Sequence, residues 1–168
     1  NRRILNKHDV TAIADSLSRL YANEDTFRVA LGRILLRMYR HDEALRNFER
    51  AIALNRQNGE AYFLIGNYYY DKGDFEQAYH WYNECLRHDP DHAGSRNNLG
   101  VLHYVSGAWD ESRAEFDRAR NISANYYDPV FNLQCLQQHV AAERLRITGV
   151  SAKNASAVFH EPHYTANA

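Results

Sequence analysis

The sequence lacks a long apolar run and carries almost no net charge. No stretch approaches the roughly 18 apolar residues that a membrane-spanning helix needs, so we expect no membrane span. The 20 basic and 21 acidic residues leave a formal net charge of −1, which gives no broad attraction to nucleic acid or to a membrane surface. The two cysteines, Cys85 and Cys135, are expected as small buried thiols without a bridge, and they do not decide the compartment.

Motifs that carry chemistry are missing as well. The chain has no glycine-rich phosphate loop, no nucleophile elbow and no HExxH motif. Nine histidines invite a search for a metal site. The close pairs are His88 with His92, which Pro90 separates, and His160 with His163; neither pair has a third and fourth ligand at a suitable spacing. The sequence therefore predicts a protein that is not an enzyme and that holds no metal or cofactor.

What the sequence does have is a pattern that recurs at a period of 34. In residues 59–92 it reads Tyr62-x2-Ile65-Gly66-x2-Tyr69, then Ala78-x3-Tyr82, then Pro90. One period later the same positions hold Arg96-x2-Leu99-Gly100-x2-His103, Ser112-x3-Phe116 and Ala124. One period earlier they hold Arg28-x2-Leu31-Gly32-x2-Leu35, Ala44-x3-Phe48 and Arg56. Repetition at this period indicates a chain built from equal helical units.

Each recurring position has a steric reason. Glycine inside a helix costs about 1 kcal/mol relative to alanine, so a glycine that returns at one phase implies a compensating close approach of two helices. The small residue that follows, near the start of the second helix, lets the two helices cross closely. The aromatic residue four positions on lies on the same face and is expected to fill the remaining space.

The turns between the paired helices are also readable. Gly73 and Gly107 lie where two helices turn, whereas Tyr39 occupies that position in the first copy and departs from the pattern. Asp74 and Asp110 are predicted N-caps of the second helices. The expected helices pair residues 26–39 with 42–54, 60–72 with 75–88, and 94–106 with 109–121.

This spacing resembles the tetratricopeptide repeat family. The resemblance implies an all-α fold, a right-handed superhelix (α-solenoid) of three tandem 34-residue helix–turn–helix repeats with an N-terminal helix and a C-terminal capping helix. The expected parts are an N-terminal packing helix (1–24), the three repeats (25–58, 59–92 and 93–126), the capping helix (127–147) and a flexible tail (148–168).

The two flanks are interpreted from their patterns. Residues 8–22 have apolar side chains at helical spacing. Residues 128–145 begin like a further first helix, with Val130-x2-Leu133, but Gln134 replaces the glycine. The tail is rich in Ala, Ser, Asn and Thr and is expected to be flexible. Because the chain starts at Asn1 and not at Met, we expect a processed protein or an excised fragment, and the sequence leaves the compartment open between cytoplasm and periplasm.

The resemblance also implies a ligand site, because the first helices of such repeats line a concave groove. The expected groove residues are Arg33, Arg37, Phe63, Asn67, Tyr70, Asn97, Asn98, Tyr104, Phe131 and Asn132. The aromatics would supply apolar contact, and the two arginines would anchor an acidic end of the ligand. Asparagine carries both a donor and an acceptor, so it pairs with the backbone of an extended peptide whatever that peptide's sequence.

Asn98 and Asn132 fall at the same position of adjacent units and form a two-rung asparagine ladder, since Ala30 and Leu64 fill the earlier rungs. Other interpretations remain open. The asparagines would then merely solvate the groove, or the aromatics would be packed by the N-terminal helix or the tail. The tail itself would fold back into the groove as a mimic of a ligand or dock into a neighbouring molecule.

One specialisation of the family is absent. Its chaperone-binding members hold a C-terminal carboxylate with Lys, Arg and Asn side chains at five positions, which this chain fills with Val29, Arg33, Leu64, Gly94 and Asn98. We therefore do not expect binding of an acidic chaperone tail.

The sequence thus predicts a non-catalytic scaffold or adaptor that binds a protein or peptide in the groove, with no nucleic-acid partner. One alternative is a self-assembling component or chaperone of a bacterial secretion, pilus or envelope machine, with homo-oligomers formed through the end faces or the tail. Another is a repeat module of a larger transferase.

Overall fold

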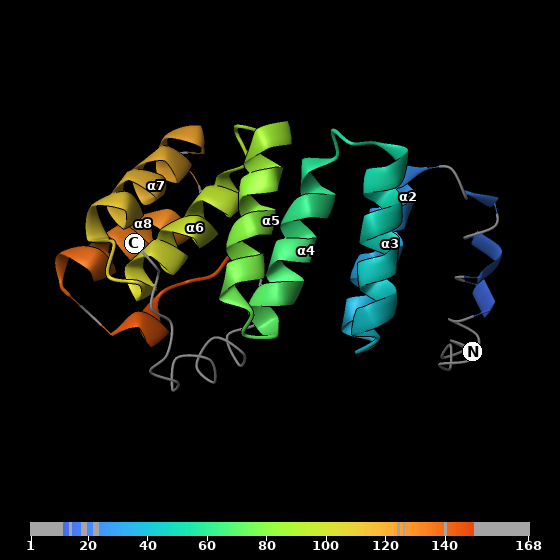
Figure 1. Ribbon diagram of the computed structural model, residues 1–168, viewed down its shortest axis with the longest axis horizontal. Coiled ribbons are helices and arrows are strands. Elements are labelled where there is room, and N and C mark those ends of the chain that lie inside the picture. Colours follow the sequence, from blue (N-terminus) through green and yellow to red (C-terminus); the bar gives the residue numbers. More distant parts are fainter. Residues whose placement is uncertain are drawn as a thin grey trace, which may run out of the picture. The chain divides into compact units, whose positions relative to one another are not determined.

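A computed structural model describes residues 12–13, 15–17, 20–21, 24–123, 125, 127–139 and 141–149. Over these ranges the secondary structure is entirely helical. The chain divides into two compact units, residues 1–61 and residues 62–168. The helices labelled in Figure 1 are α2 (Asp25–Arg37), α3 (His41–Leu54), α4 (Gly59–Asp71), α5 (Phe75–His88), α6 (Ala93–Val105), α7 (Trp109–Ile122) and α8 (Tyr127–Gln137). The short 3-10 helix η1 (Ala142–Arg144) follows α8.

The six helices from α2 to α7 agree with the predicted helices to within two residues at each end. The helix after them is shorter than the predicted capping helix over 127–147, because α8 ends at Gln137. His139 adopts a left-handed backbone with φ of 50°, which no α-helix continues through, and residues 142–144 form η1 instead. The predicted helix over 8–22 lies largely outside the described residues, as do His160, His163 and residues 150–168 of the predicted tail.

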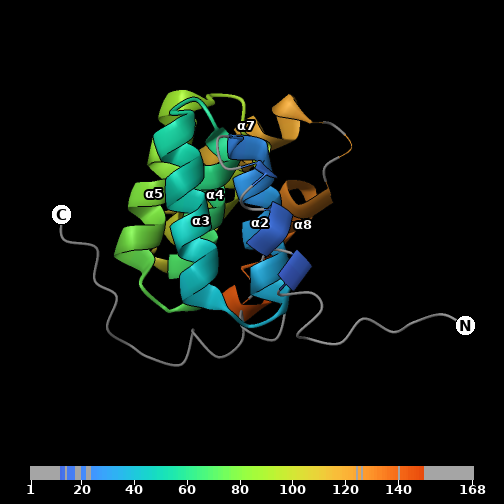
Figure 2. The same cartoon turned by 90° about the vertical axis from the view of Figure 1, so that its right-hand side faces the viewer.

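In the first unit, α2 and α3 lie side by side in both views (Figures 1 and 2). The ring of Phe48 lies directly on Gly32, so that a Cβ added there would overlap the ring. Ala44, Phe48 and Ala51 of α3 are completely buried. The predicted reason for the glycine, close approach of two helices, is confirmed here.

The second unit repeats this packing twice. A Cβ added at Gly66 would stand 2.5 Å from the Tyr82 ring, and one at Gly100 would stand 2.5 Å from the Phe116 ring. Ser112 occupies the small-residue position and donates a 2.8 Å hydrogen bond from its hydroxyl to the carbonyl of Gly100. Glycine, small residue and aromatic ring therefore form one packing unit in each helix pair, as predicted.

The turns inside the three helix pairs share one backbone conformation. Tyr39, Gly73 and Gly107 have φ values of 59°, 78° and 81°. In each turn the next amide N–H bonds to the carbonyl five residues back, as in Arg40 to Leu35 at 2.9 Å, which is the C-terminal arrangement that favours glycine. Tyr39 departs from the pattern in sequence but keeps the left-handed conformation.

Two smaller predictions have opposite outcomes. Asp74 is the N-cap of α5 and accepts a hydrogen bond from the amide of Gln77, as predicted. The prediction that Asp110 caps α7 is wrong, because that helix begins one residue earlier and its N-cap is Ala108, which makes no side-chain cap. Cys85 and Cys135 are free and buried, as predicted.

Candidate functional site: asparagine side chains on a peptide backbone

Asn132, on α8, bonds to both backbone groups of a single residue. Its Oδ1 accepts a hydrogen bond from the amide of Arg146 at 2.7 Å, and its Nδ2 donates to the carbonyl of Arg146 at 2.9 Å. The side chain is fully buried. One amide side chain thus pairs with both backbone groups of Arg146, as a neighbouring β-strand would.

Asn98, on α6, repeats this arrangement two residues further along. Its Oδ1 accepts from the amide of Thr148 at 2.8 Å, and its Nδ2 donates to the carbonyl of Thr148 at 3.2 Å. Asn98 and Asn132 are one 34-residue period apart in the sequence. One repeat therefore corresponds to two residues of the bound backbone, a step of about 7 Å in an extended chain.

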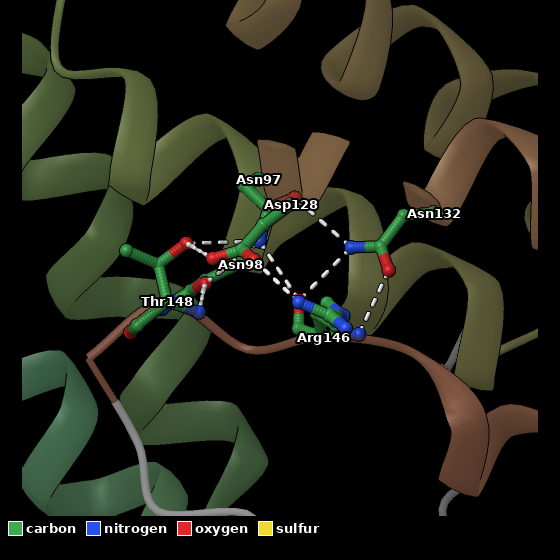
Figure 3. A network of polar contacts seen from close by, with 6 residues as sticks. All are labelled: Asn97, Asn98, Asp128, Asn132, Arg146 and Thr148. Carbon is green, nitrogen blue, oxygen red and sulfur yellow. Dashed lines mark hydrogen bonds and ion pairs between the residues drawn. The ribbon is translucent and has the colours of Figure 1, made fainter. Parts of the chain in front are cut away.

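Asn97 joins the two pairs into one network (Figure 3). Its Oδ1 accepts from Nδ2 of Asn132 at 2.9 Å, and its own Nδ2 donates to the carbonyl of Arg146 at 2.9 Å. The same nitrogen lies 3.1 Å from the hydroxyl of Thr148, which in turn donates to Asp128 at 3.2 Å. Asn97 is also fully buried, and its bond to Asn132 lies in the buried part of the network.

The side chain of Arg146 lies against α8. Its guanidinium carbon is 4.7 Å from the ring centre of Tyr127 and 4.6 Å from that of Phe131. Its Nη1 is 3.8 Å from Oδ1 of Asp128. Two aromatic faces and a carboxylate are the groups that favour a planar cation, and Arg146 is still half exposed.

Residues 145–148 alternate between buried and more exposed side chains, as in an extended strand. Leu145 has φ of −67° and ψ of 149°, and Leu145 and Ile147 are buried. We call residues 145–149 the docked segment, and Asn67, Asn97, Asn98 and Asn132 the asparagine site. The segment ends at Gly149, which has φ of 75°.

Gly149 lies against α4. A Cβ added there would stand 2.7 Å from Nδ2 of Asn67 and 3.4 Å from the ring of Phe63. The Oδ1 of Asn67 accepts from the hydroxyl of Tyr82 at 2.8 Å and from Nδ2 of Asn98 at 3.0 Å. These two donors fix the orientation of the Asn67 amide, so its Nδ2 faces the docked segment. That buried nitrogen has no hydrogen-bond acceptor among the described residues.

Tyr82 forms hydrogen bonds with two residues of the asparagine site. Its hydroxyl donates to Asn67 and lies 3.2 Å from Nδ2 of Asn98. Burial raises the pKa of this hydroxyl well above its usual value, so it remains a neutral donor at ordinary pH. The aromatic position of the repeat thus serves helix packing through its ring and the asparagine site through its oxygen.

The predicted groove residues fall into three groups. The four asparagines and Phe131 lie together around the docked segment, with Phe63 beside Gly149. Tyr70 is fully buried with its ring 5.3 Å from that of Phe75, and Tyr104 packs its ring 5.4 Å from that of Trp109. Arg33 and Arg37 are exposed on α2 in the first unit, where Arg33 pairs with Glu60.

Sequence reasoning missed several members of the site. Asp128, Tyr127 and Arg146 were not selected, and Thr148 and Gly149 were assigned to a flexible tail. Asp128 falls at an inward-facing position of the capping helix, but Thr26, Glu60 and Gly94 at the same phase show no common residue type. Arg146 has no periodic counterpart. The extended docked segment was not predicted, because the capping helix was expected to continue to residue 147. A signal existed in the alternation of Leu145, Arg146, Ile147 and Thr148, which is the period of a half-buried strand.

In the part of the chain that the structure describes, no helix is long and apolar enough to cross a membrane. In the same residues no group of three or more His, Cys, Asp or Glu side chains is placed to hold a metal ion.

Comparison with known sequences finds one family model and several relatives. A sequence model of the family described as "Anaphase-promoting complex, cyclosome, subunit 3" matches residues 37–119. "Tetratricopeptide repeat protein 8" of Mus musculus is 28% identical over 116 residues, which cover 67% of this chain and 22% of that protein. "Protein O-mannosyl-transferase TMTC1" of Homo sapiens is 25% identical over 117 residues, which cover 65% of this chain and 13% of that protein. The chain therefore spans less than a quarter of these relatives' length.

Solved structures share the fold. The structure described as "First TPR of Spaghetti (RPAP3) bound to HSP90 peptide SRMEEVD" aligns with a TM-score of 0.62 at 13% identity, covering 69% of this chain and 92% of that chain. "Crystal structure of MamA" aligns with a TM-score of 0.63 at 12% identity, covering 94% of this chain and 92% of that chain. These structures show the fold alone. The sequence matches and the recurring glycine–aromatic packing identify the chain as a member of the tetratricopeptide repeat family.

Proposed function

We propose that this chain is a non-catalytic protein-interaction module that binds an extended polypeptide segment at the asparagine site. The observation that carries the proposal is the repeated geometry of Asn132 on Arg146 and Asn98 on Thr148, in which one amide side chain meets both backbone groups of one residue. The docked segment is the chain's own example of such a ligand.

The energetics support a binding role. A buried asparagine whose partner is withdrawn leaves a donor and an acceptor unsatisfied, at about 1–3 kcal/mol. Two rungs and the linking Asn97 therefore favour an occupied site over an empty one. A residue that serves only to solvate a surface has no reason to be fully buried, as all three of these asparagines are.

The likenesses point the same way. The RPAP3 structure is described as bound to a peptide, so the fold there serves peptide binding. The positions that would hold an acidic C-terminus in this chain are Val29, Arg33, Leu64, Gly94 and Asn98, and the occupant of the asparagine site is instead an internal segment with a basic residue. We therefore infer a ligand class different from the acidic tail.

A second candidate is a module of a larger transferase. The 25% identity with human TMTC1 favours it, because the chain covers 13% of that protein. A binding module within an enzyme would use the same asparagine site, so the two proposals agree on the site. The sequence of the flanking reading frame separates them, since a transferase would add a catalytic domain there.

The experiment uses the full chain with its docked segment disabled. Leu145→Ser, Arg146→Gly, Ile147→Ser and Thr148→Gly together give a variant that we call the open chain, which keeps the asparagines. A fluorescent peptide of residues 142–149 is titrated into it, and binding is measured by anisotropy. We expect saturable binding, weakened about 5- to 150-fold when Asn98→Ala and Asn132→Ala are added.

Asn121→Ala is the matched control, because Asn121 is an exposed asparagine on α7, whereas the asparagines that bond to the docked segment lie on α6 and α8; it should leave the affinity unchanged. Circular dichroism confirms that each variant is helical. A folded open chain that binds no peptide, or an affinity that ignores both asparagines, would contradict the proposed function.

A further inference from the structure

We propose that the asparagine site selects its partner by side chains as well as backbone, and that its ligand is a flexible segment of another protein with the order aliphatic, arginine, aliphatic, threonine or serine, glycine. The docked segment, Leu145 to Gly149, has this order and is the competitor that such a partner must displace. The inference rests on the proposed function and names the ligand class of that same site.

Selection for arginine comes from α8. The guanidinium of Arg146 lies over the rings of Tyr127 and Phe131 and within ion-pair distance of Asp128. A lysine keeps the charge but loses the planar stacking, so arginine is preferred. A carboxylate at this position would meet Asp128 as a like charge, which excludes acidic segments.

Selection for a hydroxyl comes from Asn97 and Asp128. The Thr148 hydroxyl accepts from Nδ2 of Asn97 and donates to Asp128 (Figure 3). A hydroxyl is the small side-chain group that does both at once. Valine has the same shape but neither bond, and it would leave the buried Asn97 with one hydrogen bond fewer. The single carboxylate of Asp128 therefore contacts two ligand side chains, which lie two residues apart.

Selection for glycine comes from α4. The left-handed backbone of Gly149 and the 2.7 Å distance from a would-be Cβ to Nδ2 of Asn67 both disfavour any other residue. The aliphatic positions, Leu145 and Ile147, are buried.

The unpartnered Nδ2 of Asn67 shows why a foreign segment is expected to displace the docked one. This nitrogen is buried, is aimed at the docked segment, and finds no acceptor among the described residues. The docked segment is thus an incomplete ligand. A partner whose backbone places a carbonyl against Asn67 gains a hydrogen bond that the chain's own segment does not make. Without that additional hydrogen bond a foreign segment would be at a disadvantage, because the docked segment is covalently tethered beside the site.

The test compares peptides on the open chain and on the wild-type full chain. The probe is the peptide of residues 142–149, with four single changes (Arg146→Lys, Arg146→Glu, Thr148→Val and Gly149→Ala), a conservative Thr148→Ser peptide, and a scrambled peptide. We expect affinity to fall about three- to tenfold for the lysine, valine and alanine peptides and more than tenfold for the glutamate peptide, and to change less than threefold for the serine peptide.

Asp128→Asn in the open chain supplies the matched protein variant. It keeps an acceptor for the threonine hydroxyl but removes the charge, so the penalty of the Arg146→Glu peptide should shrink while that of Thr148→Val remains. The wild-type chain should bind the parent peptide at least tenfold more weakly than the open chain, because its own segment must leave first. If the open chain does not fold, the wild-type chain titrated at high peptide concentration must still give the same order of affinities.

The outcomes separate this inference from the proposed function. Equal affinity for the parent and scrambled peptides would overturn the ligand order while leaving backbone binding intact. No binding of any peptide to a folded open chain would overturn both. A wild-type chain that forms a dimer by exchanging residues 145–149, seen by light scattering, would overturn the foreign partner and identify a second copy of this chain as the occupant.

Discussion

The helix pairs of the two units share the same glycine–aromatic packing but differ in the residue at the rung position. In α2 and α3, Gly32 receives the ring of Phe48 just as Gly100 receives that of Phe116 in α6 and α7. Yet Ala30, at the rung position of α2, is exposed, whereas Asn98 at the same position of α6 is fully buried under a bound backbone. The glycine and aromatic positions of the repeat therefore build the scaffold and the rung position builds the ligand site, with the Tyr82 hydroxyl belonging to both.

The largest expected effect tests whether the scaffold is common to both units. Gly32→Ala and Gly100→Ala should each destabilise their own helix pair by about 2–3 kcal/mol, because the added methyl overlaps a packed ring. Hydrogen exchange in urea, resolved for each unit, measures this.

If the account of the scaffold holds, adding Phe48→Leu to Gly32→Ala should restore part of the lost stability. Adding Phe116→Leu to Gly100→Ala should do the same. Equal stability of wild type and Gly100→Ala would refute the shared packing unit.

The next effect tests whether the ligand site is independent of the scaffold. Asn132→Ala removes both backbone bonds to Arg146 and should raise the exchange rate of that amide about 5- to 150-fold, corresponding to about 1–3 kcal/mol. The helices α6 and α7 should keep their protection. Loss of protection throughout the second unit would mean that the asparagine holds the fold and not a ligand.

A smaller effect is expected from a substitution that gives the second unit a residue type of the first. Tyr82→Phe gives the second unit the residue type that Phe48 provides in the first, keeping the ring on Gly66 but deleting the hydroxyl between Asn67 and Asn98. Affinity of the open chain for the peptide of residues 142–149 should fall by about 1 kcal/mol, roughly fivefold, with little change in the thermal midpoint. An affinity equal to that of the parent open chain would show that Tyr82 acts in packing alone.

The smallest effect concerns the turns. Tyr39 is exposed and holds a left-handed conformation that glycine adopts in the two later turns. Tyr39→Gly should stabilise the first unit by about 0.5–1 kcal/mol, since relief of the left-handed strain exceeds the added entropy of the unfolded chain. Urea unfolding of this variant beside Gly73→Ala, which should lose stability, checks the assignment.

The sequence predicts the scaffold and the positions of the asparagines, because both recur at the period of the repeat. The scaffold was predictable because each Gly–small–aromatic unit recurs three times, so that its spacing signals close helix contact even where Tyr39 breaks the turn pattern. The asparagines were singled out for the same reason, since Asn98 and Asn132 share one phase of the repeat.

The partner of those asparagines was not predictable in the same way. The docked segment occurs once, has no periodic copy, and follows a helix whose end at Gln137 depends on the left-handed backbone of His139. No glycine or proline at that residue announces the reversal. The roles of Asp128 and Gly149 likewise exist only once the segment has returned to α6 and α4.

The central claim, that asparagine side chains hold a displaceable backbone, is tested most directly by NMR on the isotopically labelled full chain titrated with the unlabelled peptide of residues 142–149. We predict that the amide resonances of Arg146 and Thr148 move to the positions of an unstructured chain as the peptide saturates, while those of Gly66 and Gly100 stay in place. Arg146 and Thr148 resonances that remain unchanged at saturating peptide would contradict the claim and make the docked segment a fixed part of the fold.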